Sequence, residues 1–305
     1  MSIQIKQLHD TFVGEVSGVD LSQVDKTTYE ELEQALQAYA VLIFHEQILN
    51  GDEQIAFSQR FGPLETNIGN VIRKDKRRLG PAFADISNLD EQNRILPADD
   101  RRRLFAKADR LWHTDASFKH VPAKYSFLYA IKVPPEGGET EFADLRAAYD
   151  ALPRNRRDEL DSLIVEHSIF HSRAQVGFTD FSEDERTALA PSQQVLVRHL
   201  PETARSSLYI ASHASRIIGW KEKESRQLLD ELLDFSTRPN FVYQHRWNPG
   251  DLVIWDNRCT LHRGRPWDDD KYQRELRRTT VLDADNSVNL RNNQNGTVIG
   301  QAATL

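Results

Sequence analysis

Two side chains able to bind a metal stand two residues apart in the segment LWHTD, residues 111–115. In a strand, side chains at i and i+2 point to the same face, so His113 and Asp115 can offer an imidazole nitrogen and a carboxylate oxygen to one ion. A third ligand must come from elsewhere in the chain, and His262, within CTLHRG, is the best candidate. Two histidines and one carboxylate are the usual ligand set of non-heme iron(II) oxygenases. The sequence therefore predicts a metal site at these three residues.

Such a ligand set leaves three positions of an octahedral ion open. Two of them suit the keto and carboxylate oxygens of 2-oxoglutarate, and the third suits O2. Oxidative decarboxylation of this co-substrate gives succinate and CO2 and allows a hydrogen atom to be removed from an unactivated C–H bond. A His-x-Asp pair is weak on its own, because the chain has ten histidines and 46 acidic residues. A zinc-dependent hydrolase and a non-catalytic metal-binding protein are the alternatives from other classes, although the zinc-protease pattern HExxH is absent.

A dicarboxylate held by a metal at one end requires a cation at the other. Arginine suits this task, because its planar fork makes paired, charge-assisted hydrogen bonds to a carboxylate. Residues 274–278 read RELRR, and in a strand Arg274 and Arg278 share one face while Arg277 lies on the other. Two guanidinium groups can therefore enter one pocket, one for 2-oxoglutarate and one for an anionic substrate. A basic edge strand in water is the alternative interpretation.

The composition bounds the class of protein. The 305 residues carry a net charge of −7, which gives no basic footprint for a nucleic-acid partner. Cys259 is the only cysteine, so an intramolecular disulfide and a thiolate metal cluster are excluded. The start MSIQIKQLHD lacks a signal-like apolar stretch, and no run of about eighteen apolar residues occurs. We expect a cytoplasmic protein without a membrane partner.

The remaining sequence predicts the elements that must position these side chains. Strands are predicted over 41–44, 83–87, 125–133, 140–142, 195–198, 207–210, 241–247 and 251–255, and helices from Thr27, with a capping box to Glu30, and over 52–61, 145–152, 157–163 and 222–235. Many short strands with turn residues between them predict a mainly β fold with peripheral helices, a sandwich or jelly-roll barrel. Residues 1–283 are expected to form one domain, and the polar tail, 284–305, to be loosely ordered. The basic stretch 65–110 is either a lid or a solvated excursion.

Several blocks of sequence resemble one known family. They are GEVSGVDL, QIAFSQRFGPLE, LWHTDASF, PPEGGETEFADLRAAYDALP, and FVYQHRWNPGDLVIWDNRCTLHRGRPWD followed by RELRRTT. Together, from Gly14 to Asp283, they resemble the TauD/TfdA (taurine dioxygenase) family of 2-oxoglutarate-dependent dioxygenases, and within it the 2,4-dichlorophenoxyacetate dioxygenase branch. The resemblance implies a double-stranded β-helix (jelly-roll, cupin-like) core, Fe(II), 2-oxoglutarate and O2. It also implies a homodimer or a higher homo-oligomer.

The same resemblance implies residue roles. It assigns the metal to His113, Asp115 and His262, as the spacing did. Thr140 and Arg274 match the residues that bind 2-oxoglutarate. Arg278, in the same block, matches the arginine that grips the acidic group of the substrate. Related halogenating enzymes place a small residue where this chain has its aspartate, so the carboxylate indicates hydroxylation.

One departure from the family affects the substrate prediction. Many members read THPxTGR where this chain reads HLPETAR, so Leu200 replaces the usual histidine and His199 stands one place earlier. In an unchanged register this swap turns the imidazole to the opposite face of the strand. We still expect hydroxylation of a small organic acid, an aryloxyalkanoate whose product collapses to a phenol and glyoxylate. A taurine-type or alkylsulfonate hydroxylase, or a hydroxylase of another carboxylate, is the alternative within the family.

Overall fold

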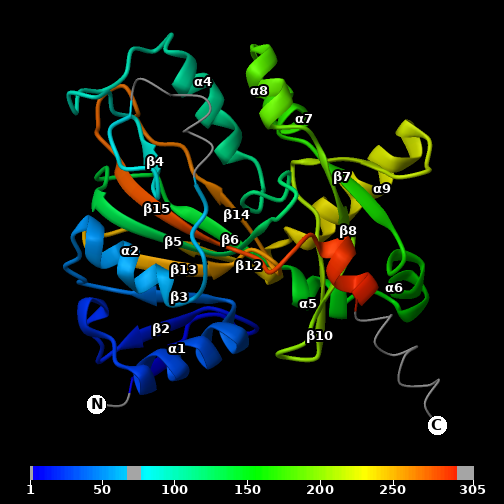
Figure 1. The fold of residues 1–305 in the computed structure, drawn as a ribbon, viewed down its shortest axis with the longest axis horizontal. Helices are drawn as coiled ribbons and strands as arrows, with labels where there is room; N and C mark the ends of the chain where they lie inside the picture. The colour runs from blue at the N-terminus through cyan, green and yellow to red at the C-terminus, as the bar shows by residue number, and fades with distance from the viewer. Residues whose placement is uncertain (1–2, 67–76, 294–305) are drawn as a thin grey trace.

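The computed structural model describes residues 3–66 and 77–293, which fold into mixed helices and strands (Figure 1). The strands are β1 (Gln4–Gln7), β2 (Gly14–Ser17), β3 (Val41–Phe44), β4 (Ala84–Ser87), β5 (Ala123–Lys132), β6 (Thr140–Asp144), β7 (Ile164–His167), β8 (Ser192–Val195), β9 (Val197–Leu200), β10 (Arg205–Leu208), β11 (Ala214–Ile217), β12 (Val242–His245), β13 (Leu252–Asp256), β14 (Thr260–Gly264) and β15 (Glu275–Leu282). The helices are α1 (Lys26–Tyr39), α2 (Gly51–Gln59), α4 (Arg101–Ala106), α5 (Leu145–Asp150), α6 (Arg154–Leu160), α7 (Ile169–Ala174), α8 (Glu183–Ala188) and α9 (Glu222–Ser236), with 3-10 turns η1 (Leu21–Gln23), η2 (Lys107–Arg110) and η3 (Pro239–Phe241).

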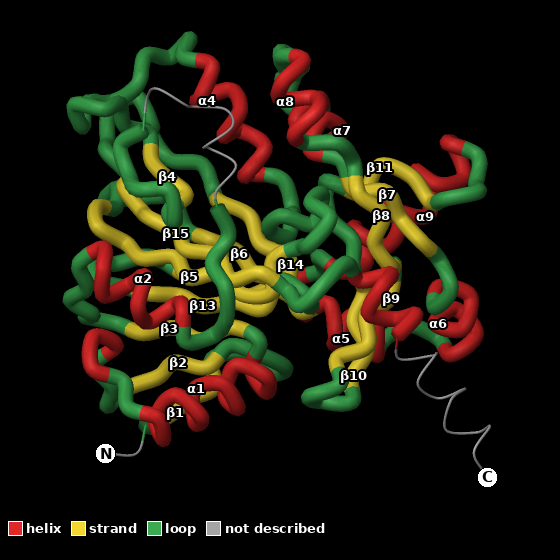
Figure 2. The backbone as a smooth tube through the Cα atoms, viewed as in Figure 1, coloured by secondary structure: helices red, strands yellow, loops and turns green. Residues whose placement is uncertain are grey.

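Two sheets pack face to face around the centre of the molecule. Within the described residues, the larger sheet has seven strands in the order β1-β2-β3-β13-β5-β15-β4, and the sheet that faces it has the order β12-β6-β14. One apolar cluster joins them, because Phe142 of the small sheet packs among Val253 and Leu128 of the large sheet. A second cluster on the other side of the large sheet includes Leu36 of α1 and Phe57 of α2. The result is a layer of helices, a large sheet and a small sheet (Figure 2).

The ends of the first two helices follow from their capping residues. α1 begins after Asp25, whose carboxylate accepts the backbone N–H of Thr28. The predicted capping box from Thr27 is therefore wrong, since an aspartate two residues earlier already satisfies this end of the helix. α2 has a true capping box, in which Asn50 and Glu53 bind each other's backbone N–H groups. The predicted strand at 41–44 is confirmed as β3, and all four of its residues are buried.

The described part of the C-terminal tail packs on the core. Residues 287–293 are helical. Asn286 is buried and donates to the backbone carbonyls of His120 and Gln193. The buried Ser287 donates its backbone N–H and its hydroxyl to the side-chain oxygen of Gln194. Residues 284–293 are thus held more firmly than the polar composition suggested, and the rest of the tail lies outside the described residues. In the described chain, no helix combines the length and the apolarity needed to cross a bilayer.

Candidate metal centre and substrate pocket

The three predicted metal ligands meet between the two sheets. His113, Asp115 and His262 are all buried, and each offers one ligand atom such that these atoms lie within 4.8 Å of one another. The two imidazole rings are 4.1 Å apart between centroids. Residues separated by about 150 positions in the chain therefore converge on one point, as the sequence predicted.

The segment that carries the first two ligands is not the strand that the spacing suggested. Residue 113 makes only an isolated bridge, in which the backbone groups of His113 and His262 exchange hydrogen bonds of 3.0 and 2.8 Å. The chain then turns, with Ala116 at a φ of 52°. After this bridge the chain binds Asn257 instead of a neighbouring strand. The Thr114 hydroxyl donates to the backbone carbonyl of Asn257, and the Asp115 N–H donates to its side-chain oxygen Oδ1. The two side chains do converge, as predicted, but the strand predicted to carry them is not formed.

The imidazoles are held in a form that suits a metal. His113 Nδ1 lies 2.8 Å from the carbonyl oxygen of Leu111, so Nδ1 carries the proton and Nε2 keeps its lone pair. Burial, followed by the charges of His113 and Arg278, lowers the pKa of His262 well below the usual range. A neutral imidazole is the form that binds transition metals. Both histidines can therefore serve as nitrogen ligands.

The carboxylate is oriented by a buried hydrogen-bond network. Ser126 donates its hydroxyl to Asp115 Oδ2 at 2.7 Å, and Asn257 Nδ2 donates to that hydroxyl at 2.9 Å. The side-chain oxygen of Asn257, Oδ1, in turn accepts from the Trp255 indole at 2.9 Å. The other carboxylate oxygen, Oδ1, faces His262 Nε2 at 3.8 Å and accepts from Arg278. One oxygen is thus fixed, and the other is presented to the point where the imidazoles converge, a donor set that fits Fe(II).

Arg274 is a buried cation that forms no ion pair with a described residue. The side chain precedes β15, donates from Nε to the Gly138 carbonyl at 3.2 Å and lies over the Trp267 ring at 5.2 Å. No carboxylate of a described residue lies within 4.0 Å of its guanidinium nitrogens, and burial lowers its pKa to about 10. A buried charge of this kind is costly unless a ligand neutralises it. The position suits one carboxylate of a bound dicarboxylate.

Thr140 and the glycines before it complete this end of the cavity. The Thr140 hydroxyl oxygen accepts from the Trp247 indole at 2.9 Å, which leaves the hydroxyl proton for another acceptor. Gly138 has a φ of 72°, and a Cβ there would lie 3.2 Å from both Cδ and Nε of Arg274. A residue without a side chain is therefore required where the chain passes the guanidinium.

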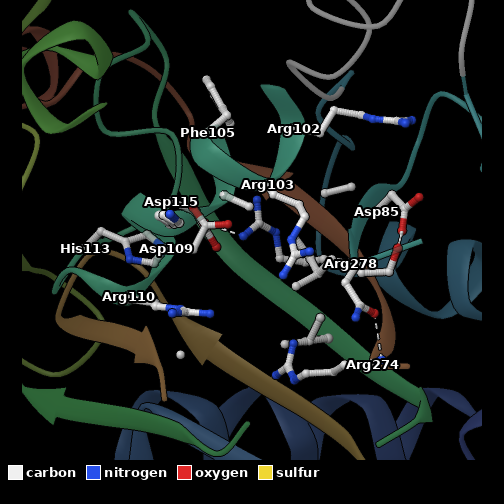
Figure 3. A pocket seen from close by; sticks show the side chains of 18 of the residues that line it. Asp85, Arg102, Arg103, Phe105, Asp109, Arg110, His113, Asp115, Arg274 and Arg278 are labelled. Carbon is white, nitrogen blue, oxygen red and sulfur yellow. Dashed lines mark hydrogen bonds and ion pairs between the residues drawn. The ribbon is translucent and has the colours of Figure 1, made fainter. Parts of the chain in front are cut away.

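A cavity of about 240 Å³ joins these groups. Figure 3 shows His113, Asp115, Arg274 and Arg278 among the side chains that line it. Arg278 of β15 and Arg274, which directly precedes that strand, both line the cavity, whereas Arg277 points away and donates to Gln54. The predicted alternation along this strand is confirmed. Much of the basic stretch 65–110 lies over the cavity, including parts of β4, α4 and η2; residues 67–76 lie outside the described chain. Its role as a lid stays a prediction.

Two residues near the metal ligands were missed by the sequence analysis. His213 is buried against His113, with ring centroids 6.2 Å apart, and its Nδ1 lies 2.8 Å from the Ser172 hydroxyl. Arg173 follows that serine in α7 and also lines the cavity. A lone histidine and a lone arginine carry no local pattern that separates them from structural residues such as the buried His167. Only the fold brings them to the site.

The departure from the family motif lies outside this cavity. Leu200 is buried in a small cluster with Ala40 and Cys259. His199 is exposed on the opposite face of β9 and interacts with Ser206 at 2.8 Å. His199 and Leu200 thus lie on opposite faces of β9, and in this chain neither side chain lines the cavity around the metal ligands.

Comparisons with known proteins agree with this geometry. Residues 4–280 match the family described as "Taurine catabolism dioxygenase TauD, TfdA family". The alpha-ketoglutarate-dependent 2,4-dichlorophenoxyacetate dioxygenase of Cupriavidus pinatubonensis is 45% identical over 284 residues, which cover 93% of this chain and 99% of that protein. The (S)-phenoxypropionate/alpha-ketoglutarate-dioxygenase of Sphingobium herbicidovorans is 37% identical, over 88% of this chain and 91% of that protein. The crystal structure of AAD-2 in complex with Mn(II) and N-oxalylglycine superposes with a TM-score of 0.91 at 43% identity, covering 94% of this chain and all of that one.

Proposed function

Because the chain belongs to the TauD/TfdA family of taurine catabolism dioxygenases, we propose that it is an Fe(II)- and 2-oxoglutarate-dependent dioxygenase that hydroxylates an aryloxyalkanoate. The observation that carries the proposal is the pairing of two features in one cavity: a His/Asp/His cluster and the buried Arg274, which forms no ion pair with a described residue. A metal that chelates one end of 2-oxoglutarate and an arginine that binds the other end account for both. A hydrolytic zinc site has no need of such a buried cation.

The residues divide the work as follows. His113, Asp115 and His262 hold Fe(II), and Ser126 and Asn257 orient the carboxylate among them. When bound, the metal supplies O2 activation coupled to decarboxylation of 2-oxoglutarate to succinate and CO2. The second reactant in that coupling, 2-oxoglutarate (alpha-ketoglutarate in the names of the relatives), is fixed at its distal carboxylate.

Two residues hold that distal carboxylate. Arg274 provides the charge, and Thr140 donates the hydroxyl proton that the Trp247 indole leaves free. Both side chains are buried, so water competes weakly for these hydrogen bonds. We infer that the co-substrate is bound in a single orientation, with its keto acid end directed to the metal ligands.

The substrate is a small organic acid with an aromatic part. Arg278 lies beside Asp115 and can pair with the acid group, while Phe105, Phe118 and Ile169 supply apolar walls for a ring. The relatives named for 2,4-dichlorophenoxyacetate and phenoxypropionate act on acids of this kind. Hydroxylation at the carbon between the ether oxygen and the carboxylate of an aryloxyacetate gives a hemiacetal. It loses the phenol and leaves glyoxylate.

The finer fold assignment belongs to the same proposal. Two facing sheets with the metal ligands between them, and the superposition on AAD-2, support a double-stranded β-helix, or jelly-roll, core. The single domain over 1–283, the cytoplasmic location and the homodimer or higher homo-oligomer stay predictions.

The test is a stoichiometric assay. The protein is supplied with ferrous iron, 2-oxoglutarate, O2 and either phenoxyacetate or 2,4-dichlorophenoxyacetate, and phenol and succinate are both quantified. We expect equal amounts of the two products, and no product without O2. Succinate without phenol, together with sulfite release from taurine, would move the substrate to the sulfonates. Turnover of an ester without O2 would replace the proposal with a zinc hydrolase.

A further inference from the structure

Besides Arg274, a second buried arginine lines the cavity that also holds Arg278. Arg173, in α7, is 7% exposed, and the proposed roles above leave it unused. Its Nη2 donates to Asp109 Oδ1 at 3.1 Å, and this is the one hydrogen bond that the guanidinium makes to a described residue. Its Nε is buried and has no partner in the described chain. The guanidinium therefore keeps donors that no described side chain satisfies.

The surroundings of Arg173 place it at the substrate end of the cavity. Its guanidinium lies 4.2 Å from the centroid of the Phe105 ring, one of the apolar walls. Burial lowers the pKa of Arg173. The charge of Arg278 lowers this pKa further, and the charge of Asp115 raises it. Arg173 in turn contributes to the lowered pKa of His213, behind the larger effect of burial. These groups line one cavity together with the metal ligands, and the charge of Asp109 acts on Arg274 as well.

The partner of Arg173 is unlike the other groups of the site. Asp109 belongs to η2, in the segment that lies over the cavity, and is among the residues that line it (Figure 3). Its side chain is 39% exposed. A carboxylate with this access to water can leave the ion pair at small cost, because water replaces its hydrogen bond. The arginine is too buried to do the same. If the pair opens, another anion has to take the place of Asp109.

We propose that Arg173 binds the carboxylate of the substrate together with Arg278, and that Asp109 is the counter-ion which the substrate displaces. This inference rests on the proposed function, which supplies an anionic substrate. Arg278 is likewise paired with a protein carboxylate, that of Asp115. Two guanidinium groups on one carboxylate fix its direction as well as its position. The aromatic part is then set against Phe105 and the reacting carbon towards the metal ligands.

The experiment measures binding apart from turnover. Phenoxyacetate is titrated by calorimetry into protein loaded with Mn(II) and 2-oxoglutarate in the absence of O2. We expect Arg173→Gln to weaken phenoxyacetate at least tenfold and to change the affinity for 2-oxoglutarate less than twofold. Phenoxyacetamide, which has the same shape without the charge, should bind both proteins equally. Arg216→Gln is the matched control, since Arg216 pairs with Glu166 at 2.8 Å on β11, away from the cavity.

A second variant separates substrate binding from a structural ion pair. Asp109→Asn removes the displaced counter-ion, so we expect phenoxyacetate to bind about threefold more tightly. A purely structural Arg173–Asp109 pair predicts that both variants weaken binding. That result, or an equal loss of phenoxyacetamide, overturns the inference. Asp109 is half exposed, so this variant remains informative even if Arg173→Gln fails to fold.

The two proposals fail differently. Wild-type protein that binds phenoxyacetate, with the expected response to both variants, but releases no phenol contradicts the proposed reaction and leaves the role of Arg173 standing. Release of phenol with unchanged binding by Arg173→Gln contradicts the role of Arg173 alone. Wild-type protein that does not bind phenoxyacetate contradicts both.

Discussion

The two sides of the cavity are held in place by different sets of interactions. On the sheet side, the metal ligands rest on backbone hydrogen bonds between residues 113 and 262 and on the buried chain Trp255–Asn257–Ser126–Asp115. On the opposite side, the segment 101–110 is attached through ion pairs, among them Arg103 and Arg110 to Asp269 at 2.7 and 2.9 Å, and through Leu104 and Phe105, which pack against an apolar cluster.

We infer that the sheet side serves the reaction, whereas the segment 101–110 serves the selection of the substrate. A buried hydrogen bond whose partner is removed costs about 1–3 kcal/mol, because the remaining group is left without water. A partly exposed ion pair contributes about 0–1 kcal/mol and is screened by salt. The ligands of a metal must be fixed before the reaction, whereas a segment that covers a substrate must open. We expect substitutions on the sheet side to weaken the binding of the metal and of 2-oxoglutarate strongly. Substitutions in the segment 101–110 should have only a small effect on the opening of that segment.

Removal of a metal ligand is the largest test of the fixed side. We expect His262→Ala to lower turnover at least about a thousandfold, because two ligands and water cannot replace an imidazole within the buried site. Iron content of the anaerobically loaded protein and succinate release are the measurements. His199→Ala, a change at an exposed histidine, is the control and should retain both. Full iron content and turnover in His262→Ala would place the metal elsewhere.

Removal of the co-substrate cation is the next largest test. Arg274→Gln loses a charge-assisted hydrogen bond worth about 2–3 kcal/mol, which corresponds to a rise of roughly a hundredfold in the KM for 2-oxoglutarate. Iron binding should be unchanged, because Arg274 makes no contact with the three ligands. Arg277→Gln, on the other face of the same strand, should leave the KM for 2-oxoglutarate within twofold. Equal effects of the two variants would mean that the strand, rather than the guanidinium, is responsible.

A smaller effect is expected one contact away from the metal. Ser126→Ala deletes the hydroxyl that donates to Asp115 Oδ2, while the backbone bridge and both imidazoles remain. We expect iron to bind about tenfold more weakly, as is usual when an orienting partner of a ligand is lost. An iron titration followed by turnover checks this, and excess iron should restore most of the rate. A loss that iron cannot restore would show that the hydroxyl acts in another way.

The sequence was sufficient for the parts of the site that local patterns determine. Alternation along a strand placed Arg274 and Arg278 on one side and Arg277 on the other. The ligand chemistry of His113 and Asp115 was recognised, but the strand predicted for them is not formed, since the side chain of Asn257 replaces a neighbouring strand.

The missed residues depend on distant segments. Arg173 acquires its role from a carboxylate 64 positions earlier in the chain. His213 is held against His113 by the hydroxyl of Ser172, 41 positions away. Neither partner is marked by any periodicity. The segment over the cavity was likewise open to two interpretations, because ion pairs with residues 269 and 270 exist only after folding.

The attachment of the segment over the cavity gives a weaker test. Asp269→Asn removes the acceptor shared by Arg103 and Arg110, at a cost of about 0.5–1 kcal/mol. Amide hydrogen exchange of residues 101–110 should become about two- to fivefold faster, with no change at residues 113–115. High salt should produce the same effect in the wild-type protein. Asp268→Asn, at the exposed neighbour, is the control. Faster exchange at the metal ligands as well would contradict the division into two independently held sides.

The smallest effect on activity is expected at the position that departs from the family. Leu200 belongs to neither side of the cavity, since it packs with Ala40 and Cys259. Leu200→His should therefore leave kcat and the KM for phenoxyacetate within about twofold. Burial of the imidazole without a partner should cost about 1–3 kcal/mol of the free energy of unfolding, seen as a lower melting temperature. His199→Ala, one residue earlier and exposed, should change neither quantity. If the histidine instead alters the KM for the acid more than fivefold, position 200 reaches the substrate, and the two sides described here do not account for selection.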